Sequence, residues 1–317
     1  MITKLRIYET AQTDPHRNLA TEKHLMDITQ PGECLLYLWQ NKNTVVIGKN
    51  QNPWLECRTS LLDEEGGVLA RRLSGGGAVF HDLGNLNFTF IMCKEDYDLD
   101  KQLSVIQSAC ALAGIATEKS GRNDVLADGR KFSGNAFYQN RTHAYHHGTL
   151  MVDVDKDKLG RYLSPPKAKL EAKGVTSVRS RVVNLKEICP QLSVEQMKIS
   201  MMEAFAMVYG KSIQILTPSA LDTAAIEALR ARNATWEWNC GKKLPFSMTV
   251  EGRFSWGGVE IGLDVEGGIV KNAKVWSDSM DENFPKELEK SLLGRKMTLS
   301  DLQNLPPDIL ELLKEII

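Results

Sequence analysis

Three consecutive glycines, Gly75 to Gly77, constrain this chain more than any other feature of its sequence. A glycine loses more conformational freedom on folding than any other residue, so three of them before a strand-like AVFHD segment carry a high entropic cost. A tight turn flanked by solvated arginines would need only one or two glycines. We therefore expect backbone that approaches a ligand closely and offers its N–H groups to anionic oxygens. Arg71 and Arg72 would supply fixed positive charge beside it.

Two common nucleotide-binding patterns do not account for these glycines. A GxGxxG dinucleotide-binding pattern must open a helix, whereas a strand is predicted to follow here. The GxxxxGK[ST] phosphate-binding pattern is not met either, because Phe205 stands where the first glycine before Gly210-Lys211-Ser212 would be required. Neither of those folds is therefore expected.

A second group of reactive side chains lies in the segment DVLADGRKFSG. Asp128-Gly129 is a favoured two-residue turn, so this segment is predicted to be a hairpin that places Lys131 on a strand. A lysine ammonium can contact two anionic groups, and Asp124 could hold Mg²⁺, which prefers one or two carboxylates plus phosphate oxygens. Taken alone, Lys131 fits a solvated strand lysine more readily, and Asp124 a turn residue. His146-His147 on the next predicted strand would position substrate or serve as structural histidines.

Composition narrows the class of protein. The 39 basic and 40 acidic residues nearly balance, which argues against a protein that coats nucleic acid. No apolar run reaches the roughly 18 residues of a membrane span, and the N-terminus lacks the apolar core of a signal peptide, so we expect a cytoplasmic protein. The six cysteines form no C-x-x-C pair, which disfavours a zinc site or redox dithiol and predicts free, buried thiols.

The pattern of apolar residues predicts an α+β protein with two unequal domains, at residues 1–245 and 246–317. A helix is expected from Leu99 to Ala113, ended by Gly114, and another after the capping box of Ser193 and Gln196. In the second domain, alternation from Val259 to Val265 predicts a half-buried antiparallel strand, followed by short leucine-rich helices. Adjacent strands of a mostly antiparallel or mixed sheet are expected at CLLYLW, TVVIG, VLARR, AVFHD and LNFTFIM.

Five motifs occur in a characteristic order: RRLSGGGAVFHDLGN, GRNDV, RKFSGNA, HHGTL and KGVTSVRSRVVNL. In this order and spacing they resemble the lipoate–protein ligase A family, and the resemblance runs from NLATEKHL at Asn18 through Trp236 to RFSWGGVEI. It implies a biotin/lipoate-ligase-like large domain, with mixed, mostly antiparallel sheets flanked by helices, and a small α+β accessory domain. It also implies two reactions: lipoate and ATP give lipoyl-AMP and pyrophosphate, and a lysine of a lipoyl domain then takes the lipoyl group.

The same resemblance implies roles for individual residues. Lys131 would be the catalytic lysine that bridges the lipoate carboxylate and the α-phosphate, with Asp124 as the metal ligand for Mg²⁺. The nucleotide would be bound by Arg72, Gly77, Ala78, Val79, Phe80, Asn123, Asp124 and Lys131. Lipoate would be bound by Leu73, Ser74, Gly75, Gly76, His81, Ser133 and His147. The implied acceptors are lipoyl domains of 2-oxoacid dehydrogenase E2 subunits and the glycine cleavage H protein, and we expect a monomer.

Two mobile elements are also expected. The basic, poorly periodic segment Ser164–Arg181 is predicted to be a long loop, and residues 167–184 to close over the adenylate and exclude water from the mixed anhydride. By resemblance, the small domain would rotate about a hinge near Lys242–Ser247.

Four alternatives stay open within this fold. They are a transferase that uses only preformed lipoyl-AMP, an octanoyl transferase with a cysteine thioester, a biotin ligase, and a non-enzymatic lipoate-binding sensor. The cysteines lie outside the glycine and Lys131 motifs, and the glycine–arginine segment matches the lipoate side of the superfamily. A sensor would need an added effector domain, and the tail region has no helix-turn-helix pattern. The sequence leaves the preferred acceptor and the use of octanoate undecided.

Overall fold

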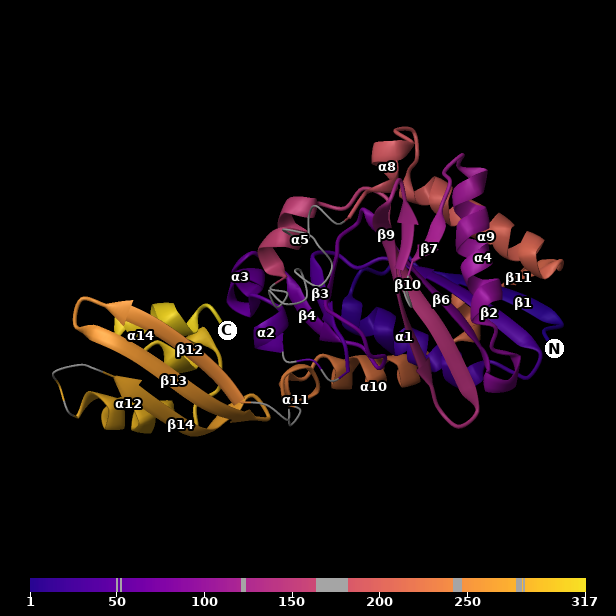
Figure 1. The fold of residues 1–317 in the computed structure, drawn as a ribbon. Helices are drawn as coiled ribbons and strands as arrows, with labels where there is room; N and C mark the ends of the chain where they lie inside the picture. Colours follow the sequence, from indigo (N-terminus) through magenta and orange to yellow (C-terminus); the bar gives the residue numbers. More distant parts are fainter. Residues whose placement is uncertain are drawn as a thin grey trace.

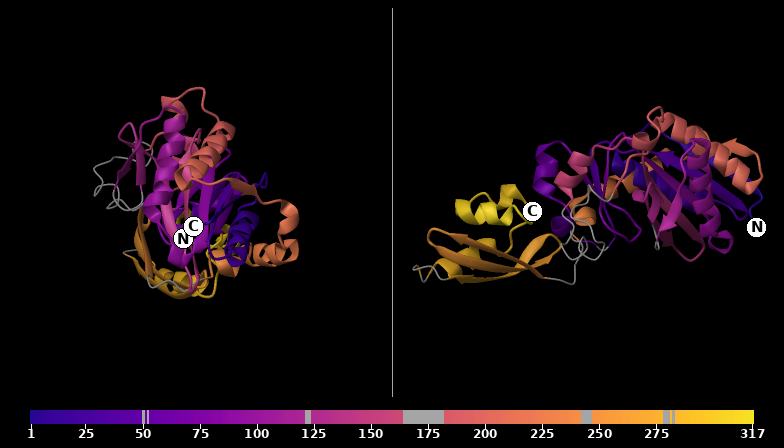
Figure 2. Two further views of the ribbon diagram at one scale, coloured as in Figure 1. Left: turned by 90° about the vertical axis from the view of Figure 1, so that its right-hand side faces the viewer. Right: turned by 45° about the horizontal axis from the view of Figure 1, so that its top comes forward.

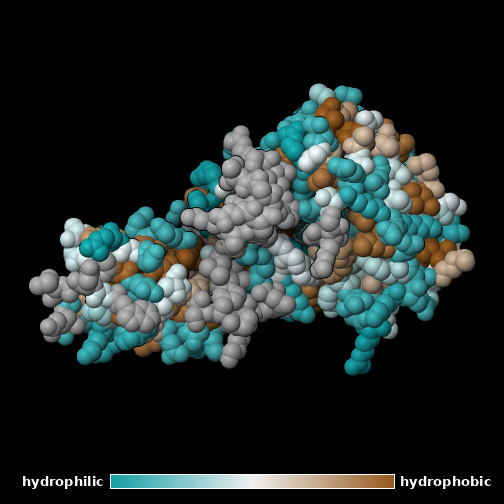
Figure 3. All heavy atoms as spheres, viewed as in Figure 1, coloured by the Kyte–Doolittle hydropathy of each residue, from teal (hydrophilic) through white to brown (hydrophobic). Residues whose placement is uncertain are grey.

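A computed structural model describes residues 1–49, 51, 53–120, 124–163, 182–241, 247–277, 281 and 283–317. The chain forms a large N-terminal unit and a small C-terminal unit at one end of it (Figures 1 and 2). On the face seen in Figure 3, hydrophilic and hydrophobic residues are interspersed over the coloured surface of the large unit. Within the described residues, every helix is too short or too polar to cross a bilayer.

An eight-stranded sheet organises the large unit. In spatial order its strands are β11 (Ile213–Ile215), β1 (Lys4–Glu9), β2 (Glu33–Trp39), β6 (Asn85–Cys93), β10 (His143–Met151), β9 (Arg130–Gln139), β8 (Asp124–Ala127) and β7 (Glu118–Ser120). Strand β1 runs parallel to both of its neighbours, and all the other pairs are antiparallel. The predicted mixed, mostly antiparallel α+β fold is confirmed.

The central strand β6 is buried along its whole length and separates two environments. Its even-numbered side chains, such as Phe88 and Phe90, join the core beneath α4 (Leu99–Leu112) and α9 (Val194–Tyr209). On the other face, Ile91 packs in the core that contains Leu25 of α1 (Pro15–Ile28). The predicted ends of α4 and α9 are confirmed: Gly114 follows α4 with a φ of +74°, and the Ser193–Gln196 capping box begins α9.

A separate three-stranded sheet carries the glycine motif. Its order is β4 (Val68–Arg71), β3 (Thr44–Ile47) and β5 (Val79–His81), with β3 parallel to β4 and antiparallel to β5. The expectation that the strands from VLARR to LNFTFIM are successive neighbours in one sheet is therefore wrong. The parallel pair needs a crossover, which α2 (Pro53–Glu56) and α3 (Thr59–Glu64) provide, so β3 lies between β4 and β5.

The predicted Lys131 hairpin is present as β8 and β9. Asp128 and Gly129 both have positive φ, 51° and 66°, as a type I′ turn requires. Strand β9 also holds the end of the predicted lid, because Val183 N donates to the Lys131 carbonyl at 2.9 Å. The rest of that lid, with the whole Ser164–Arg181 segment, lies outside the described residues. The remaining elements of this unit are η1 (Lys94–Asp96), α5 (Lys156–Tyr162), α8 (Leu185–Ile188), η2 (Pro218–Ala220), α10 (Thr223–Asn233) and α11 (Trp236–Asn239).

The described residues of the C-terminal unit form an antiparallel sheet of β12 (Ser247–Phe254), β13 (Gly257–Glu266) and β14 (Ile269–Ser277) and three helices. These helices are α12 (Phe284–Leu292), α13 (Leu299–Leu302) and α14 (Pro307–Leu313), and the alternation predicted for β13 is confirmed by its buried apolar residues. Trp54 of the large unit joins this core, and its indole N–H donates to the Met297 carbonyl at 3.1 Å. The predicted domain boundary after residue 245, and most of the predicted hinge, lie outside the described residues.

Candidate active site

The side chain of Arg72 holds the conformation of the glycine turn, Gly75 to Gly77, by hydrogen bonds to its carbonyl groups. This arginine is buried, and its Nη2 donates to the carbonyls of Gly75 at 2.7 Å and Gly77 at 2.8 Å. Its Nη1 donates to the Val46 carbonyl at 3.1 Å, which ties the turn to β3. Gly76 has a φ of +92°, a conformation that other residues rarely adopt. The alternative of a simple turn beside solvated arginines is therefore wrong.

The outer side of the turn is available to a ligand. Within the part of the chain that the structure describes, the N–H groups of Gly75, Gly76 and Gly77 donate to no protein group, and Gly75 and Gly76 are exposed. Successive N–H groups of this kind can bind an anionic oxygen. Gly48 supports the turn from behind, because a Cβ atom at Gly48 would lie 2.4 Å from the Gly76 carbonyl oxygen.

Arg71 has a different role from the one expected of it. Its guanidinium turns away from the glycines and donates to the carbonyls of Gly48, Lys49, Gln51 and Asn239 at 2.6–3.1 Å. Burial lowers the pKa of Arg71 to about 10, so it stays charged at neutral pH. Arg71 thus joins the loop behind the glycine turn to the end of α11, and it does not contribute to the cavity wall.

A cavity of about 170 Å³ lies between the two sheets and brings the two sequence motifs together. The predicted residues that line it are Arg72, Gly76, Gly77, Ala78, Val79, His81, Asp124, Lys131 and His147. The predicted residues that are not part of its wall are Leu73, Ser74, Gly75, Phe80 and Ser133. Phe80 packs instead against Tyr162 in a neighbouring core, and Asn123 lies outside the described residues.

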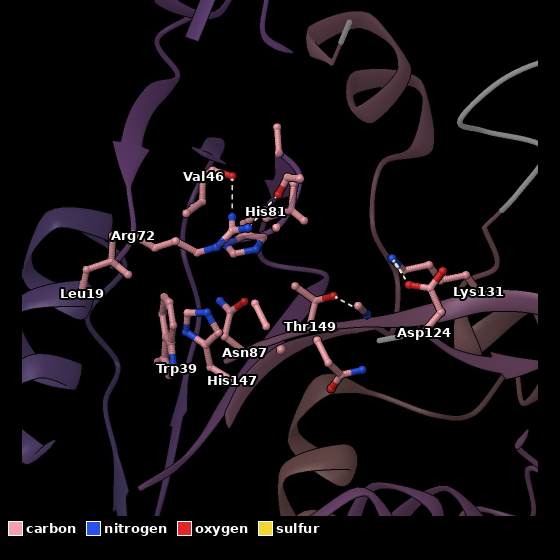
Figure 4. Close-up of a pocket in the computed structure, with 18 residues that line it drawn as sticks. Leu19, Trp39, Val46, Arg72, His81, Asn87, Asp124, Lys131, His147 and Thr149 are labelled. Atoms are coloured by element: carbon pink, nitrogen blue, oxygen red, sulfur yellow. Dashed lines mark hydrogen bonds and ion pairs between the residues drawn. The ribbon is translucent and has the colours of Figure 1, made fainter. Parts of the chain in front are cut away.

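Lys131 faces this cavity together with Asp124 (Figure 4). Its Nζ lies 2.7 Å from Asp124 Oδ1, and the two side chains are 21% and 11% exposed. The lysine chain lies over Gly134, where a Cβ atom would approach Nζ to 2.8 Å. Lys131 therefore lines the same cavity as Gly76 and Gly77, two of the three consecutive glycines.

The opposite end of the cavity is polar and hydrogen-bonded. His147 lies between Ser74 Oγ, 2.7 Å from its Nε2, and Glu22 Oε1, 2.8 Å from its Nδ1. Glu22 comes from α1 and also accepts from Thr89 Oγ1 at 2.7 Å. Ser74 therefore contacts a residue of the cavity wall, His147, without being part of the wall itself. His146 points to the other face of the sheet, between Phe88 and Phe90, and is a structural histidine.

Several lining residues were not predicted from the sequence. Trp39, Asn87 and Thr149 are register partners across β2, β6 and β10, so they form one row on the cavity wall. The segment NLNFTF contained a signal for this row, because Asn85, Asn87 and Thr89 alternate with large apolar residues. A buried central strand with one polar face indicates a polar cavity beside it.

The cysteines contribute no nucleophile to the described cavity. All six are buried free thiols, as predicted, and none of them lines it. Burial raises the pKa of Cys57 and Cys110 to about 12, so neither thiolate is populated at neutral pH. This environment argues against an enzyme that works through a cysteine thioester.

Comparison with protein families agrees with this geometry. Residues 14–206 match the family described as the lipoyl protein ligase A/B catalytic domain. The chain belongs to the lipoate–protein ligase family. Residues 243–310 match the bacterial lipoate protein ligase C-terminus, so both units of this lipoate–protein ligase family member have counterparts in the family. The resemblance expected from the five sequence motifs is confirmed.

Solved structures share the fold. P. falciparum LipL1 in complex with lipoate is 26% identical, with 97% of each chain covered and a TM-score of 0.67. A bipartite lipoate protein ligase from Thermoplasma acidophilum, studied with its E2 lipoyl domain, is 25% identical over 76% of this chain and 97% of that one, with a TM-score of 0.64. A lipoate-protein ligase A bound with ATP is 23% identical, covers 76% of this chain and 99% of that one, and shares the fold with a TM-score of 0.63.

Proposed function

We propose that this family member is an ATP-dependent lipoate–protein ligase that carries out both half-reactions. Lipoate and ATP would give lipoyl-AMP and pyrophosphate, and a lysine of an acceptor domain would then take the lipoyl group and release AMP. The observation that carries this proposal is the shared cavity of Lys131 and the glycine turn, which offers to the same ligand an ammonium and N–H groups that donate to no group among the described residues.

In the first step a carboxylate oxygen attacks the α-phosphorus, and pyrophosphate leaves. Two anionic groups must approach each other, so the site has to neutralise charge where they meet. We assign that task to the Lys131 ammonium, with the N–H groups of Gly76 and Gly77 as further donors to phosphate oxygens. Asp124 holds the ammonium in place at 2.7 Å, and Arg72 holds the turn.

Mg²⁺ would accompany ATP. Among the described residues that line the cavity, Asp124 alone carries a carboxylate, and no group of three His, Cys, Asp or Glu side chains gathers in the described part of the chain. A single carboxylate fits Mg²⁺, which takes most of its ligands from phosphate oxygens and water. Asp124 would therefore hold the ion, which would offset negative charge on the phosphates.

In the second step, the acceptor lysine must lose its proton before it attacks the acyl carbon, because its ordinary pKa is about 10.4. We propose lipoyl domains of 2-oxoacid dehydrogenase E2 subunits and the glycine cleavage H protein as acceptors, and a cytoplasmic monomer as the active form. The neighbour from T. acidophilum, studied with its E2 lipoyl domain, supports the first class of acceptor.

Lipoate-dependent exchange of pyrophosphate with ATP tests this proposal. The wild type should catalyse exchange, whereas Lys131→Met should lose both exchange and transfer from supplied lipoyl-AMP. Lys119→Met is a matched control, because Lys119 is also a strand lysine paired with an aspartate at 2.7 Å but lies outside the cavity. Absence of exchange in the wild type would favour a transferase or a sensor, and exchange retained by Lys131→Met would remove Lys131 from the reaction.

A further inference from the structure

Two buried N–H donors on the cavity wall have no partner within the described part of the chain. They are Nε2 of His81, on β5, and Nδ2 of Asn87, on β6. Their side chains belong to residues that are only 3% and 1% exposed. A buried donor left unpaired costs free energy comparable to a lost hydrogen bond, so two of them in one cavity indicate a ligand that accepts hydrogen bonds there.

The hydrogen-bond chain behind His81 determines which of its nitrogens carries the proton. Asn18 Nδ2 donates to Asn41 Oδ1 at 3.0 Å, so the amide nitrogen of Asn41 faces His81 Nδ1, at 3.2 Å. Nδ1 of His81 must therefore accept. Burial, with the nearby charge of Arg72, lowers the pKa of His81 to about 3, and the neutral ring then bears its proton on Nε2.

Asn87 is oriented in a similar way. Asn85 Nδ2 donates to Asn87 Oδ1 at 2.9 Å, which leaves the Asn87 amide group as a donor. Asn87 is the register partner of Trp39 on one side and of Thr149 on the other. Figure 4 shows Asn87, Trp39 and His147 apart from Lys131 and Asp124, toward the other end of the cavity.

We propose that Asn87 and His81 form a donor subsite that selects an acyl chain carrying sulfur over a saturated chain of the same length. This inference rests on the proposed function, which puts the carboxylate of the acid at Lys131; the tail would then extend to the opposite end of the cavity, where His81 and Asn87 lie. The two sulfurs of the lipoyl ring are the tail's only heteroatoms, and sulfur accepts hydrogen bonds weakly. A saturated octanoyl tail would leave both donors unpaired against methylene groups, which is unfavourable.

The experiment compares lipoate with octanoate in the wild type and in Asn87→Leu, which removes the amide at similar volume. The quantity measured is the ratio of kcat/KM for the two acids in pyrophosphate exchange, together with the ratio of their Kd values without ATP. We expect the wild type to prefer lipoate and the substitution to lower both ratios about tenfold, the effect of one unpaired buried donor. Partial misfolding would reduce both activities equally and leave the ratios unchanged.

Thr149→Val is the matched control. Thr149 lies beside Asn87 in the same row, but its hydroxyl already accepts from Gly134 N at 3.2 Å, so this substitution should affect both acids alike. Equal binding of the two acids by the wild type, or an unchanged ratio in Asn87→Leu, would overturn the donor subsite and indicate that the two donors hold water. Loss of exchange with both acids in the wild type would contradict the proposed adenylation, while the Kd ratio would still test the subsite.

Discussion

Gly48→Ala should displace the glycine turn without touching any ligand directly. The added Cβ atom would lie 2.4 Å from the Gly76 carbonyl oxygen, 3.3 Å from the Gly75 carbonyl carbon and 3.4 Å from Arg72 Nη2. The first contact is about 1 Å shorter than an ordinary van der Waals contact. The added Cβ atom cannot rotate away and the oxygen it meets is backbone, so the turn must move. A misplacement of about 1 Å can reduce the rate about 100-fold, and overpacking of this kind costs about 1–3 kcal/mol of stability.

Pyrophosphate exchange at saturating ATP would measure the rate, and urea denaturation would measure the stability. Gly160→Ala is the matched control, because Gly160 lies on α5 with open space around its would-be Cβ and no positive φ. There, alanine should stabilise the helix by about 0.5–1 kcal/mol and leave exchange unchanged. Wild-type exchange in a folded Gly48→Ala variant would refute the reasoning, because it would show that the position of the turn does not determine activity.

Two further predictions concern stability. Trp54→Ala should lower the free energy of unfolding by about 3–5 kcal/mol, because this indole is 2% exposed in the C-terminal core and donates to the Met297 carbonyl. Urea denaturation should then show the small unit unfolding before the large one, and a single transition at the wild-type midpoint would contradict this. The pKa of His81 is about 3 in the folded protein and about 6.5 in the unfolded chain, so between these pH values only the unfolded chain gains the proton. As the pH falls from 6.5 to 3, the free energy of unfolding should therefore decrease by up to about 1.4 kcal/mol per pH unit. A His81→Gln variant should show a shallower loss between pH 6.5 and 5, and an identical slope would exclude His81 as the cause.

The parts of the site that follow from local chemistry could be predicted from the sequence. The Asp128-Gly129 turn has a specific backbone conformation, so the hairpin and the strand position of Lys131 could be inferred from a few residues. The glycine run indicated a ligand-facing turn for the same reason. Two interpretations of Lys131 were open, a solvated strand lysine and a lysine that contacts anionic groups of a ligand, and the family resemblance favoured the second.

The parts that depend on distant contacts could not be predicted. Arg71 looked like a ligand-binding charge beside Arg72, but its main acceptor is Asn239, 168 residues further along the chain. Similarly, His147 contacts Glu22, which is 125 residues away, and nothing local to either residue indicates the pair. The prediction of which strands are neighbours was wrong for β3, β4 and β5, because the regular spacing of strands along the sequence does not indicate a parallel crossover.

Strand β6 supplies side chains both to the cavity wall and to the hydrophobic core of the large unit. Asn87 faces the cavity, whereas Phe88 and Phe90 face α4 and α9, and polar and apolar side chains alternate from Asn85 to Phe90. A one-residue deletion in the preceding bend, Asp82–Gly84, that shifted the register of β6 by one residue would move each side chain to the opposite face of the sheet. Aromatic rings would then fill the cavity, and amide groups would be buried in the apolar core. Single side chains that line this end of the cavity can therefore be substituted while the fold is kept. An insertion or deletion that shifts the register of β6 should instead prevent the large unit from folding.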